Sequence, residues 1–506
     1  MSLSVAFTRA AIGIQAPLVT VEVHISNGLP ALSLVGLPET TVKEARDRVR
    51  SAILNSGFTF PAKRITVNLA PADLPKEGGR YDLPIAIAIL AASEQIPTVN
   101  LTRYEFLGEL ALTGALRGIQ GAIPAALAAI DAQRQLILSA DNHNDVGLVR
   151  HGVTLIARHL LEVCAFLHGR GELEGAHCDH QPAPPDTRDL NEIIGQQQAK
   201  RALEVTAAGG HNLLLIGPPG TGKTMLASRL SGLMPPLSDR EALESASVAS
   251  LVSSGDLRRQ WRQRPFRSPH HSASLYALVG GGALPKPGEI SLAHNGVLFL
   301  DELPEFERRT LDALREPLES GEISISRARA KITYPARFQL IAAMNPSPTG
   351  HYRGSHNRCS PQQTLRYLSR LSGPFLDRFD LSLEVPLLPA GTLSHQQTKS
   401  ESTRQVRERV LAARERQLVR CGKVNALMNN PEIQLYCTLT REDAEWLEQV
   451  LNQLGLSVRA WQRIVKVART IADLACEPEI QREHLTEAVS YRGIDRLMIH
   501  LQNSLE

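Results

Sequence analysis

The chain has 506 residues, of which 43% are apolar and 21% are charged, and its formal net charge is +3 at pH 7. One compact core rarely holds so many residues, so we expect two or three domains. The composition excludes a disordered chain, and so small a net charge does not by itself indicate a nucleic-acid partner. We find no secretory signal in residues 1–7 and no stretch near the roughly 20 apolar residues of a membrane span. A cytoplasmic protein with reduced cysteines and no membrane contact is expected.

Residues 1–175 are predicted to form one mixed α/β domain. Alternating or short apolar runs predict strands at residues 20–25, 64–69 and 136–138. Helical patterns predict helices at residues 41–55, 83–92 and 122–135. The first helix is expected to start at a capping box formed by Thr41 and Glu44. The following residues, 176–189, are rich in proline and polar side chains and are predicted to be a linker.

A second α/β domain is expected over residues 190–385 and a helical domain over residues 386–506. In the helical domain, Thr440 and Asp443 form a predicted capping box before an amphipathic helix, and Ser457 precedes a second one.

A nucleotide-binding motif stands in the second domain. The apolar run 212–216 is suited to a buried strand, and a helix is expected from Met225. Between them stands the complete motif G-x-x-x-x-G-K-[ST], formed by Gly217, Pro218, Pro219, Gly220, Thr221, Gly222, Lys223 and Thr224. Backbone N–H groups of such a loop surround phosphates, Lys223 can reach the β- and γ-phosphates, and Thr224 can hold Mg²⁺. ATP and Mg²⁺ are therefore the predicted cofactors.

Two later strands end in polar side chains that suit the same chemistry. The apolar strand 296–300 ends in Asp301 and Glu302, and carboxylates there are costly unless a cation is near. Asp301 is predicted to hold the magnesium shell, and Glu302 to orient and deprotonate the attacking water. Asn345 follows the strand 338–342 and is predicted to contact the water or the γ-phosphate. A strand end that simply reaches solvent, or an Asn that opens a turn, is the alternative.

This order of motifs resembles the AAA+ ATPases of the magnesium-chelatase and MCM-like branch. Three segments look like that branch's helix-2 insert and second acidic motif: residues 264–274, 280–282 and 285–302. Residues 321–336 alternate and look like the family's hairpin before the third strand. The resemblance implies a parallel-sheet P-loop ATPase domain with this insert and hairpin, followed by a C-terminal helical lid.

The first domain looks like the Lon-protease-like domain, of the ribosomal S5 domain 2-like fold, in the YifB/ComM family. Residues 35–52, 68–86 and 107–117 carry this likeness, so the resemblance covers essentially the whole chain. Where the protease family has its serine nucleophile this chain has Arg80, and residues 119–126 lack the partner lysine. Without a hydroxyl or an activating base no peptide is cleaved, so a non-proteolytic platform is expected.

A ring motor needs a cation delivered to the γ-phosphate of the adjacent subunit. Arg378 is the predicted finger, with Arg370 as second choice, and Arg459 is the predicted cation from the helical lid. The alternative for each is a surface arginine paired with a nearby carboxylate.

DNA contacts are expected on the hairpin. Arg327, Arg329 and Lys331 occupy alternate positions, so we expect them on one strand face, where they would bind phosphates without reading bases. Lys286 in the insert is a further candidate. A solvated edge strand, protected by its charge, is the alternative.

Two groups of possible zinc ligands are too sparse for a structural site, namely His351 with His356 and Cys359, and His177 with Cys178 and His180. The pair His270 and His271 is expected to be a polar turn. The family resemblance implies a hexameric ring that drives branch migration of recombining DNA, including strand integration during natural transformation. A chelatase-type motor that remodels a protein partner, or a nucleotide-stabilised assembly platform, is the alternative.

Overall fold

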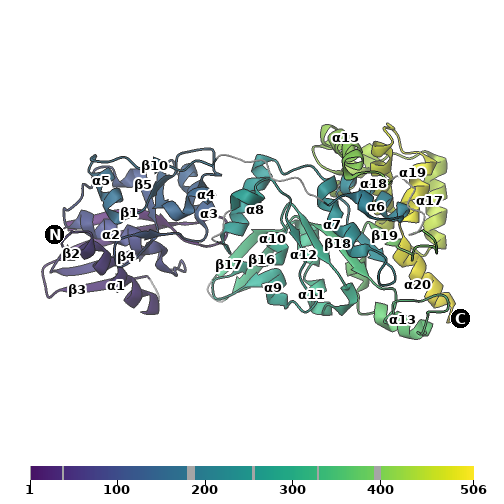
Figure 1. Cartoon of the computed structure of the whole chain (residues 1–506), viewed down its shortest axis with the longest axis horizontal. Helices are drawn as coiled ribbons and strands as arrows, with labels where there is room; N and C mark the ends of the chain where they lie inside the picture. The colour runs from purple at the N-terminus through teal and green to yellow at the C-terminus, as the bar shows by residue number, and fades with distance from the viewer. Residues whose placement is uncertain are drawn as a thin grey trace.

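The computed structural model describes residues 2–36, 39–178, 188–253, 257–327, 330–392 and 400–505. The molecule is long, with the N-terminal part at one end, the helical C-terminal part at the other and a second α/β unit between them (Figure 1). The predicted mixed α/β class is confirmed.

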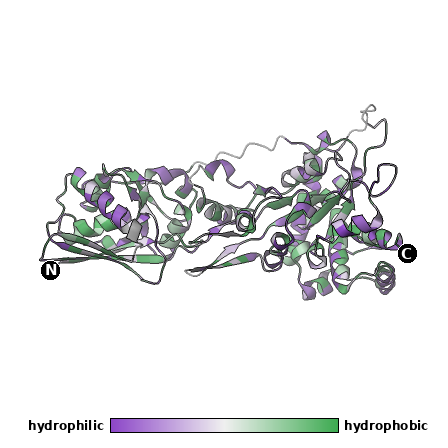
Figure 2. Ribbon diagram, turned by 90° about the horizontal axis from the view of Figure 1, so that it is seen from below, coloured by the Kyte–Doolittle hydropathy of each residue, from purple (hydrophilic) through white to green (hydrophobic). Residues whose placement is uncertain are grey.

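The N-terminal part is built on an eight-stranded mixed sheet in the order β10-β9-β8-β5-β1-β2-β4-β3. Its strands are β1 (Ser2–Arg9), β2 (Leu18–Ser26), β3 (Ala31–Val35), β4 (Arg64–Ala70), β5 (Tyr104–Leu107), β8 (Gln135–Ser139), β9 (Leu155–Ala157) and β10 (Glu174–Gly175), with the separate ribbon β6 (Glu109–Leu110) and β7 (Leu116–Arg117). The three predicted strands are all present. Figure 2 shows apolar residues following the strands of this sheet.

Its helices are α1 (Glu39–Asn55), α2 (Asp82–Ala92), α3 (Ala122–Asp131), α4 (His143–Val146) and α5 (Leu160–Leu167). Every residue of α2 is buried, because this helix packs against β1, β2 and β5. Two predicted boundaries were wrong. The backbone is already helical at Glu39, so Thr41 does not cap α1, and α3 ends early because Gln133 adopts a left-handed φ of 57°.

The central part contains a five-stranded sheet in the order β12-β15-β18-β11-β19. Its strands are β11 (Leu213–Ile216), β12 (Phe266–Arg267), β15 (Val297–Leu300), β18 (Gln339–Met344) and β19 (Leu381–Glu384). All four neighbouring pairs are parallel, so the carboxyl ends of the strands meet at one edge. The segments that follow β11, β12, β15 and β18 are thereby brought together.

Helices surround this sheet: α6 (Gln197–Gly209), α7 (Lys223–Leu233), α8 (Asp239–Ser250), α9 (Leu275–Val279), α10 (Glu289–Leu292), α11 (Arg308–Asp312), α12 (Arg315–Ser320), α13 (Pro361–Leu368) and α14 (Gly373–Leu376). The insert, defined here as residues 268–295 between β12 and β15, contains α9, α10 and a short ribbon of β13 (Gly280–Gly281) with β14 (Lys286–Pro287).

The predicted hairpin is present as β16 (Glu322–Arg327) and β17 (Ala330–Pro335). Ile323, Ile325, Ile332 and Tyr334 form its buried face. The Tyr334 hydroxyl donates to the carbonyl of Pro285, 2.6 Å away, which ties the hairpin to the insert. The other face, with Ser324, Ser326, Lys331 and Thr333, is exposed.

The C-terminal part is helical, with α15 (Thr403–Cys421), α16 (Asn430–Tyr436), α17 (Arg441–Gln453), α18 (Val458–Leu474), α19 (Arg482–Ser490) and α20 (Gly493–Asn503). Thr440 caps α17 by accepting from the Asp443 N–H, and Ser457 precedes α18, both as predicted. For α17, the reciprocal Asp443 bond of a capping box is not formed.

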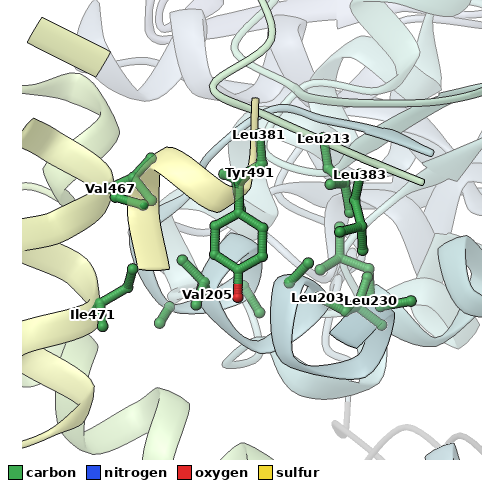
Figure 3. Packing of buried hydrophobic residues seen from close by; sticks show 14 of the residues in the cluster. Leu203, Val205, Leu213, Leu230, Leu381, Leu383, Val467, Ile471 and Tyr491 are labelled. Carbon is green, nitrogen blue, oxygen red and sulfur yellow. The ribbon is translucent and has the colours of Figure 1, made fainter. Parts of the chain in front are cut away.

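One apolar core joins the central and C-terminal parts. Figure 3 shows Leu203 and Val205 of α6 and Leu230 of α7 under Leu213, Leu381 and Leu383 of the sheet, with Val467 and Ile471 of α18 reaching them from the other side. Burying a side chain of this size stabilises the fold by about 1.5–3 kcal/mol. The sheet edge that carries the candidate site is therefore held on a rigid base.

The N-terminal part packs against α8 and the hairpin. A shared apolar cluster joins Ile123 and Ala126 of α3 to Leu237, Leu257 and Trp261 of the central part. The Gly121 N–H donates to the carbonyl of Ser250 over 2.8 Å. In the loop after β1, Ile12 and Ile14 pack against the cluster that contains the hairpin's apolar face.

Among the helices of the described ranges, none is long and apolar enough to cross a membrane. All six cysteines lie in the described ranges, and none of them forms a disulfide.

Candidate functional site

The loop 217–224 turns from β11 into α7 at the carboxyl edge of the central sheet. Its conformation needs glycine: Gly220 and Gly222 have φ of 78° and 88°, in the left-handed region. A Cβ on Gly217 would lie 2.2 Å from the carbonyl oxygen of Val385. The helix begins at Lys223, two residues earlier than predicted, so its N-terminal N–H groups face the loop's own concave side.

The Lys223 ammonium is at the centre of this loop. It donates to the carbonyls of Gly217 at 2.8 Å and Pro218 at 2.7 Å, and Oδ1 of Asn345 is 3.4 Å away. Burial lowers the pKa of Lys223, and the charge of Asp301 opposes this change. A buried ammonium that only backbone carbonyls and an amide satisfy is suited to an incoming polyanion.

Thr224 and Asp301 meet beside the lysine. The Thr224 hydroxyl donates to Oδ2 of Asp301 over 2.8 Å, and the N–H of Glu302 donates to Oδ1 of Asp301 over 2.9 Å. A hydroxyl and a carboxylate this close offer two hard oxygen ligands, the type that Mg²⁺ prefers. These residues therefore fit a magnesium ion bound with a nucleotide, in the pairing that the sequence predicted.

Glu302 adopts a left-handed backbone with φ 52° and ψ 49°, which a non-glycine residue rarely adopts. Its side chain is 59% exposed, and Oε2 is 2.9 Å from Nδ1 of His271 in the insert. The partner of Glu302 is thus a residue that the sequence indicated only as part of a polar turn.

Asn345 lies directly after β18, between the loop and the end of β15, at 3.4 Å from the Lys223 ammonium. The structure thus brings together Lys223, Thr224, Asp301 and Asn345, from three neighbouring strands. It leaves the predicted roles of these residues, and those of the arginines below, as proposals.

Arg378 lies at the opposite edge of the sheet. Its carbonyl accepts from Nδ2 of Asn212, which precedes β11, whereas the phosphate loop follows β11. The five intervening residues of extended chain span about 15 Å. Its guanidinium pairs with Glu319, the alternative that the sequence left open; the Glu319 side chain is 59% exposed, but that of Arg378 is only 16% exposed.

Arg459 belongs to the same group of cations. Burial lowers the pKa of Arg378, and the positive charges of Arg463, Arg315 and Arg459 lower it further. Arg463 donates to the carbonyl of Phe379 at 3.3 Å, which places the first turns of α18 beside this segment. The pair with Glu319 and the charges of Asp380 and Asp377 near Arg463 offset part of this positive charge.

Arg370, the second choice for the finger, lies elsewhere. It contacts the carbonyl of Pro304 and both oxygens of Glu305 at 3.4 Å, just after the end of β15, and its guanidinium is 5.7 Å from the ring centre of Tyr367. It is therefore at the same edge as its own phosphate loop, unlike Arg378.

The expectation of a cationic row on one hairpin face was wrong. The register pairs Arg327 with Ala330 and Ser326 with Lys331. Directly paired residues share a face, so positions 327 and 331 lie on opposite faces. The pattern was taken for one strand, but the two positions belong to two antiparallel strands. Arg329 lies outside the described residues, as does the side chain of Arg327.

Lys331 and Lys286 are both exposed. Nζ of Lys286 is 3.3 Å from Oε1 of Gln120 in the N-terminal part. Lys286 thus reaches the N-terminal part, whereas Lys331 is on the exposed face of the hairpin.

Within the described ranges no group of three or more His, Cys, Asp or Glu side chains could hold a metal ion. The rings of His351 and His356 are 5.4 Å apart, while Sγ of Cys359 is 3.4 Å from the Thr349 hydroxyl. His180 lies outside the described residues.

Sequence reasoning missed two residues at this edge. His271 contacts Glu302, as described above. Gln196 donates to the carbonyls of Thr221 at 3.2 Å and Pro386 at 2.8 Å, which braces the phosphate loop against the end of β19. The sequence shows His270 and His271 as a polar pair after the short strand β12. Only the pairing of β12 with β15 reveals that His271 lies beside Glu302.

A parallel five-stranded sheet with this loop and acidic strand end defines a P-loop nucleotide-binding protein. Comparison with protein-family models agrees. Residues 189–393 match the magnesium chelatase, subunit ChlI model, residues 21–142 match the subunit ChlI of Mg-chelatase model, and residues 400–492 match its C-terminal model.

Comparison with individual proteins is more specific. The chain is 68% identical to the uncharacterized protein YifB of Salmonella typhimurium, over 100% of both chains. It is 62% identical to the competence protein ComM of Haemophilus influenzae, over 99% of this chain and 100% of that one. The 38 kDa magnesium-chelatase subunit of Rhodobacter capsulatus is 28% identical, over 59% of this chain and 86% of that one. The chain belongs to the YifB/ComM family of magnesium-chelatase-like AAA+ proteins, which implies use of a nucleotide with Mg²⁺.

Proposed function

We propose that this protein is an ATP-hydrolysing DNA motor that assembles into a hexameric ring and drives branch migration in homologous recombination and natural transformation. The single observation that carries the proposal is the convergence of Lys223, Thr224, Asp301 and Asn345 at one sheet edge. The proposal also includes a cytoplasmic location. It divides the chain into domains at residues 1–175, 190–385 and 386–506, with a linker at residues 176–189 between the first two.

The hydrolytic chemistry follows from the side chains at this edge. Lys223 would exchange its carbonyl partners for β- and γ-phosphate oxygens, which brings a charge-assisted bond to the buried ammonium. Thr224 and Asp301 would hold magnesium, which supplies positive charge at the β- and γ-phosphates. Glu302, turned from His271 toward the phosphates, would take a proton from the attacking water, and Asn345 would orient that water.

We propose that Arg378 and Arg459 serve the nucleotide of an adjacent copy. The backbone of Arg378 lies beyond the far edge of the sheet, about 15 Å from its own phosphate loop, and Arg459 adds positive charge near it, which supports this arrangement. Arg370 contacts the end of β15 in its own copy, which argues against it as a finger in trans. The pair with Glu319 would open when the neighbouring phosphate binds.

The proposed contact with DNA rests on the name of one relative and on two exposed lysines. The name of the Haemophilus influenzae relative supports a role in competence. Lys331 and Lys286 are exposed on the hairpin and the insert, elements that the Tyr334 hydroxyl joins. Backbone contacts of this kind suit a motor that moves along any sequence.

For the N-terminal part we propose a Lon-protease-like fold without protease activity. Arg80 is 6% exposed and donates to the carbonyl of Gln120 at 3.3 Å, so its position offers no nucleophile. The contacts of the N-terminal part with the central part favour a platform for the ring or for DNA.

The decisive test is ATP-dependent movement of a purified three- or four-stranded DNA junction, with Lys223→Ala as control. We expect the wild type to resolve the junction and the variant not to. ATP turnover should rise with DNA, and this stimulation should fall steeply as salt increases, because phosphate contacts release counterions. Clean protein that never hydrolyses ATP, with or without DNA, would contradict the proposal.

The likeness to a magnesium-chelatase subunit favours a second candidate, a motor that remodels a protein partner. ATP turnover that responds to a protein partner and not to DNA would support it. A ring that forms with nucleotide but shows no turnover would instead indicate an assembly platform.

A further inference from the structure

A cavity of about 630 Å³ opens at the carboxyl edge of the central sheet, outside the phosphate loop. One wall is the segment that follows β18, with Pro348 and Thr349. Another wall is α13 together with the turn after it, as far as Arg370. The volume is in the range of about 300–1,000 Å³ that is usual for small-molecule sites. The cavity is therefore large enough for a ligand of its own.

Two contacts place this cavity next to the candidate nucleotide site. A Cβ on Gly350, the residue after Thr349, would lie 2.6 Å from Cδ of Pro219, so this wall touches the phosphate loop. On the other side, Nη1 of Arg370 is 3.4 Å from the carbonyl oxygen of Pro304, in the segment that follows β15. Since β15 and β18 are neighbouring parallel strands, the cavity borders the edge that carries the candidate site.

Three exposed arginines line the cavity, namely Arg358, Arg366 and Arg370. Arg370 pairs with Glu305 at 3.4 Å, whereas Arg358 and Arg366 form no ion pair with any residue that the structure describes. Within the described ranges, no aspartate or glutamate lines the cavity. Three guanidinium groups with one carboxylate nearby leave a positive charge, and a cleft lined by charges of one sign concentrates counter-ions.

The kind of anion follows from the donors that the cavity offers. A guanidinium group presents its N–H groups as a planar fork, which matches two oxygens of a phosphate group. Tyr367 adds a hydroxyl at the buried side of the cavity. Burial raises the pKa of Tyr367 to about 12, and the charge of Glu305 adds to this effect while that of Arg370 opposes it. The phenol therefore keeps its proton at neutral pH and remains a donor.

We propose that Arg358, Arg366 and Arg370 form a binding site for the inorganic phosphate that ATP hydrolysis releases. Phosphate would then leave in two steps, first from the phosphate loop to these arginines and then from the arginines to solvent. Arg370 thereby serves its own copy, in agreement with its contact at the end of β15. This inference rests on the proposed ATP hydrolysis and adds the route of its product.

Binding is measured with radiolabelled inorganic phosphate by equilibrium dialysis of full-length Lys223→Ala protein, in which the competing phosphate loop is disabled. We expect a single saturable site per chain. Adding Arg358→Ala with Arg366→Ala to this background should weaken phosphate binding about tenfold or more, the loss expected when hydrogen bonds from a charged group are removed. Both side chains are exposed, so the variants should fold.

Arg353→Ala is the matched control for these variants. Arg353 is an exposed arginine of the same segment, and its guanidinium lies 4.7 Å from the ring centre of Tyr352, but it does not line the cavity. Its removal should leave the affinity for phosphate unchanged. Arg366→Lys keeps a positive charge but loses the planar fork, so it should bind phosphate with an affinity between those of the arginine and alanine proteins.

A single-turnover experiment on protein with an intact Lys223 tests the route itself. Cleavage of ATP is followed by chemical quenching, and free phosphate by a fluorescent phosphate sensor. In the wild type we expect free phosphate to appear after a delay. The double variant should shorten this delay about tenfold or more, because a loss of affinity appears mainly in the dissociation rate. Arg353→Ala should keep the wild-type delay.

The outcomes separate this inference from the proposed function. If the Lys223→Ala protein binds no phosphate, if the double variant binds it as tightly as its background, or if the wild type shows no delay, the site is absent while ATP hydrolysis stands. If a short single-stranded DNA displaces the labelled phosphate, the cavity takes a phosphodiester backbone and the inference is wrong. Wild-type protein that never hydrolyses ATP overturns the proposed function, and this product site with it.

Discussion

Glu302 and Asp301 are adjacent in the chain, yet the geometry gives them different partners. Asp301 is bound to the Thr224 hydroxyl, whereas Glu302 reaches His271. We expect Glu302→Gln to bind ATP as the wild type does and to lower kcat by about 10²- to 10⁴-fold, because the amide cannot accept the proton. Binding of a fluorescent nucleotide and single-turnover hydrolysis measure the two effects separately. Unimpaired turnover in the glutamine variant would remove Glu302 from the mechanism.

The second prediction at this scale concerns Arg378. Arg378→Ala should reduce ATP turnover about 10³-fold or more, the range for a finger that acts on the transferred phosphate. Mixed with Lys223→Ala protein, it should regain part of the activity, because one of the two kinds of mixed interface pairs an intact loop with an intact arginine. Arg370→Ala is the matched control and should not show this rescue. Failure of the mixture to recover activity would count against an arginine supplied by a neighbour.

Among the secondary-structure elements, the hairpin and the insert form one packed unit. The double variant Lys331→Ala with Lys286→Ala should weaken duplex binding at every sequence tested. The slope of log affinity against log salt should fall by about 0.9 per lost phosphate contact. Fluorescence anisotropy over a salt series measures both quantities. Equal affinity and slope would show that these exposed lysines do not contact DNA.

A second element-scale feature is the junction between the sheet and the helical lid. Asp380 accepts from the Asn212 N–H at 3.1 Å, and Oδ2 is 3.4 Å from the His211 ring. Burial would raise the pKa of Asp380, but the contact with His211 and the charges of Lys466 and Arg463 hold it well below its usual range. The ionised carboxylate therefore joins β11 and β19 to α18.

The sign of the pH dependence follows from this lowered pKa. Stabilisation by Asp380 is complete above its unfolded pKa of about 3.9 and is lost as pH falls toward the folded value. We expect Asp380→Asn to lower Tm at pH 7, and the difference from wild type to shrink below about pH 4. Thermal unfolding over a pH series measures this, with the exposed Asp47→Asn as control. A constant difference across that range would contradict the assignment.

On the scale of the whole molecule, the N-terminal part is attached where the proposed DNA elements lie. Trp261 is 7% exposed in the apolar cluster that joins α3 to the central part. Trp261→Ala should destabilise this junction by about 3–5 kcal/mol. Limited proteolysis should then release the N-terminal part early, while nucleotide binding by the phosphate loop persists. Loss of nucleotide binding in parallel with the junction would mean that the two parts do not behave separately.

A feature could be predicted from the sequence where residues close together in the chain determine it. The phosphate loop, Asp301 and Asn345 were found because each belongs to a short motif at a strand end. The hairpin was located correctly, but its faces were not, because the antiparallel pairing of Arg327 with Ala330 reverses the alternation that a single strand would have. The early end of α3 was not predicted. Gln133 adopts a left-handed backbone there, and a glutamine does not indicate such a conformation in the sequence as a glycine would.

The sequence by itself determined the family, the α/β class, the phosphate loop and the residues proposed to bind a nucleotide, because these depend on local patterns and on motifs with fixed spacing. Only the tertiary structure decided that His271 lies beside Glu302, that Arg378 lies beyond the far edge of its own sheet and that the N-terminal part contacts the hairpin. The physical reason is that these contacts arise from the order of parallel strands and from the packing of distant segments, and no spacing along the chain encodes either.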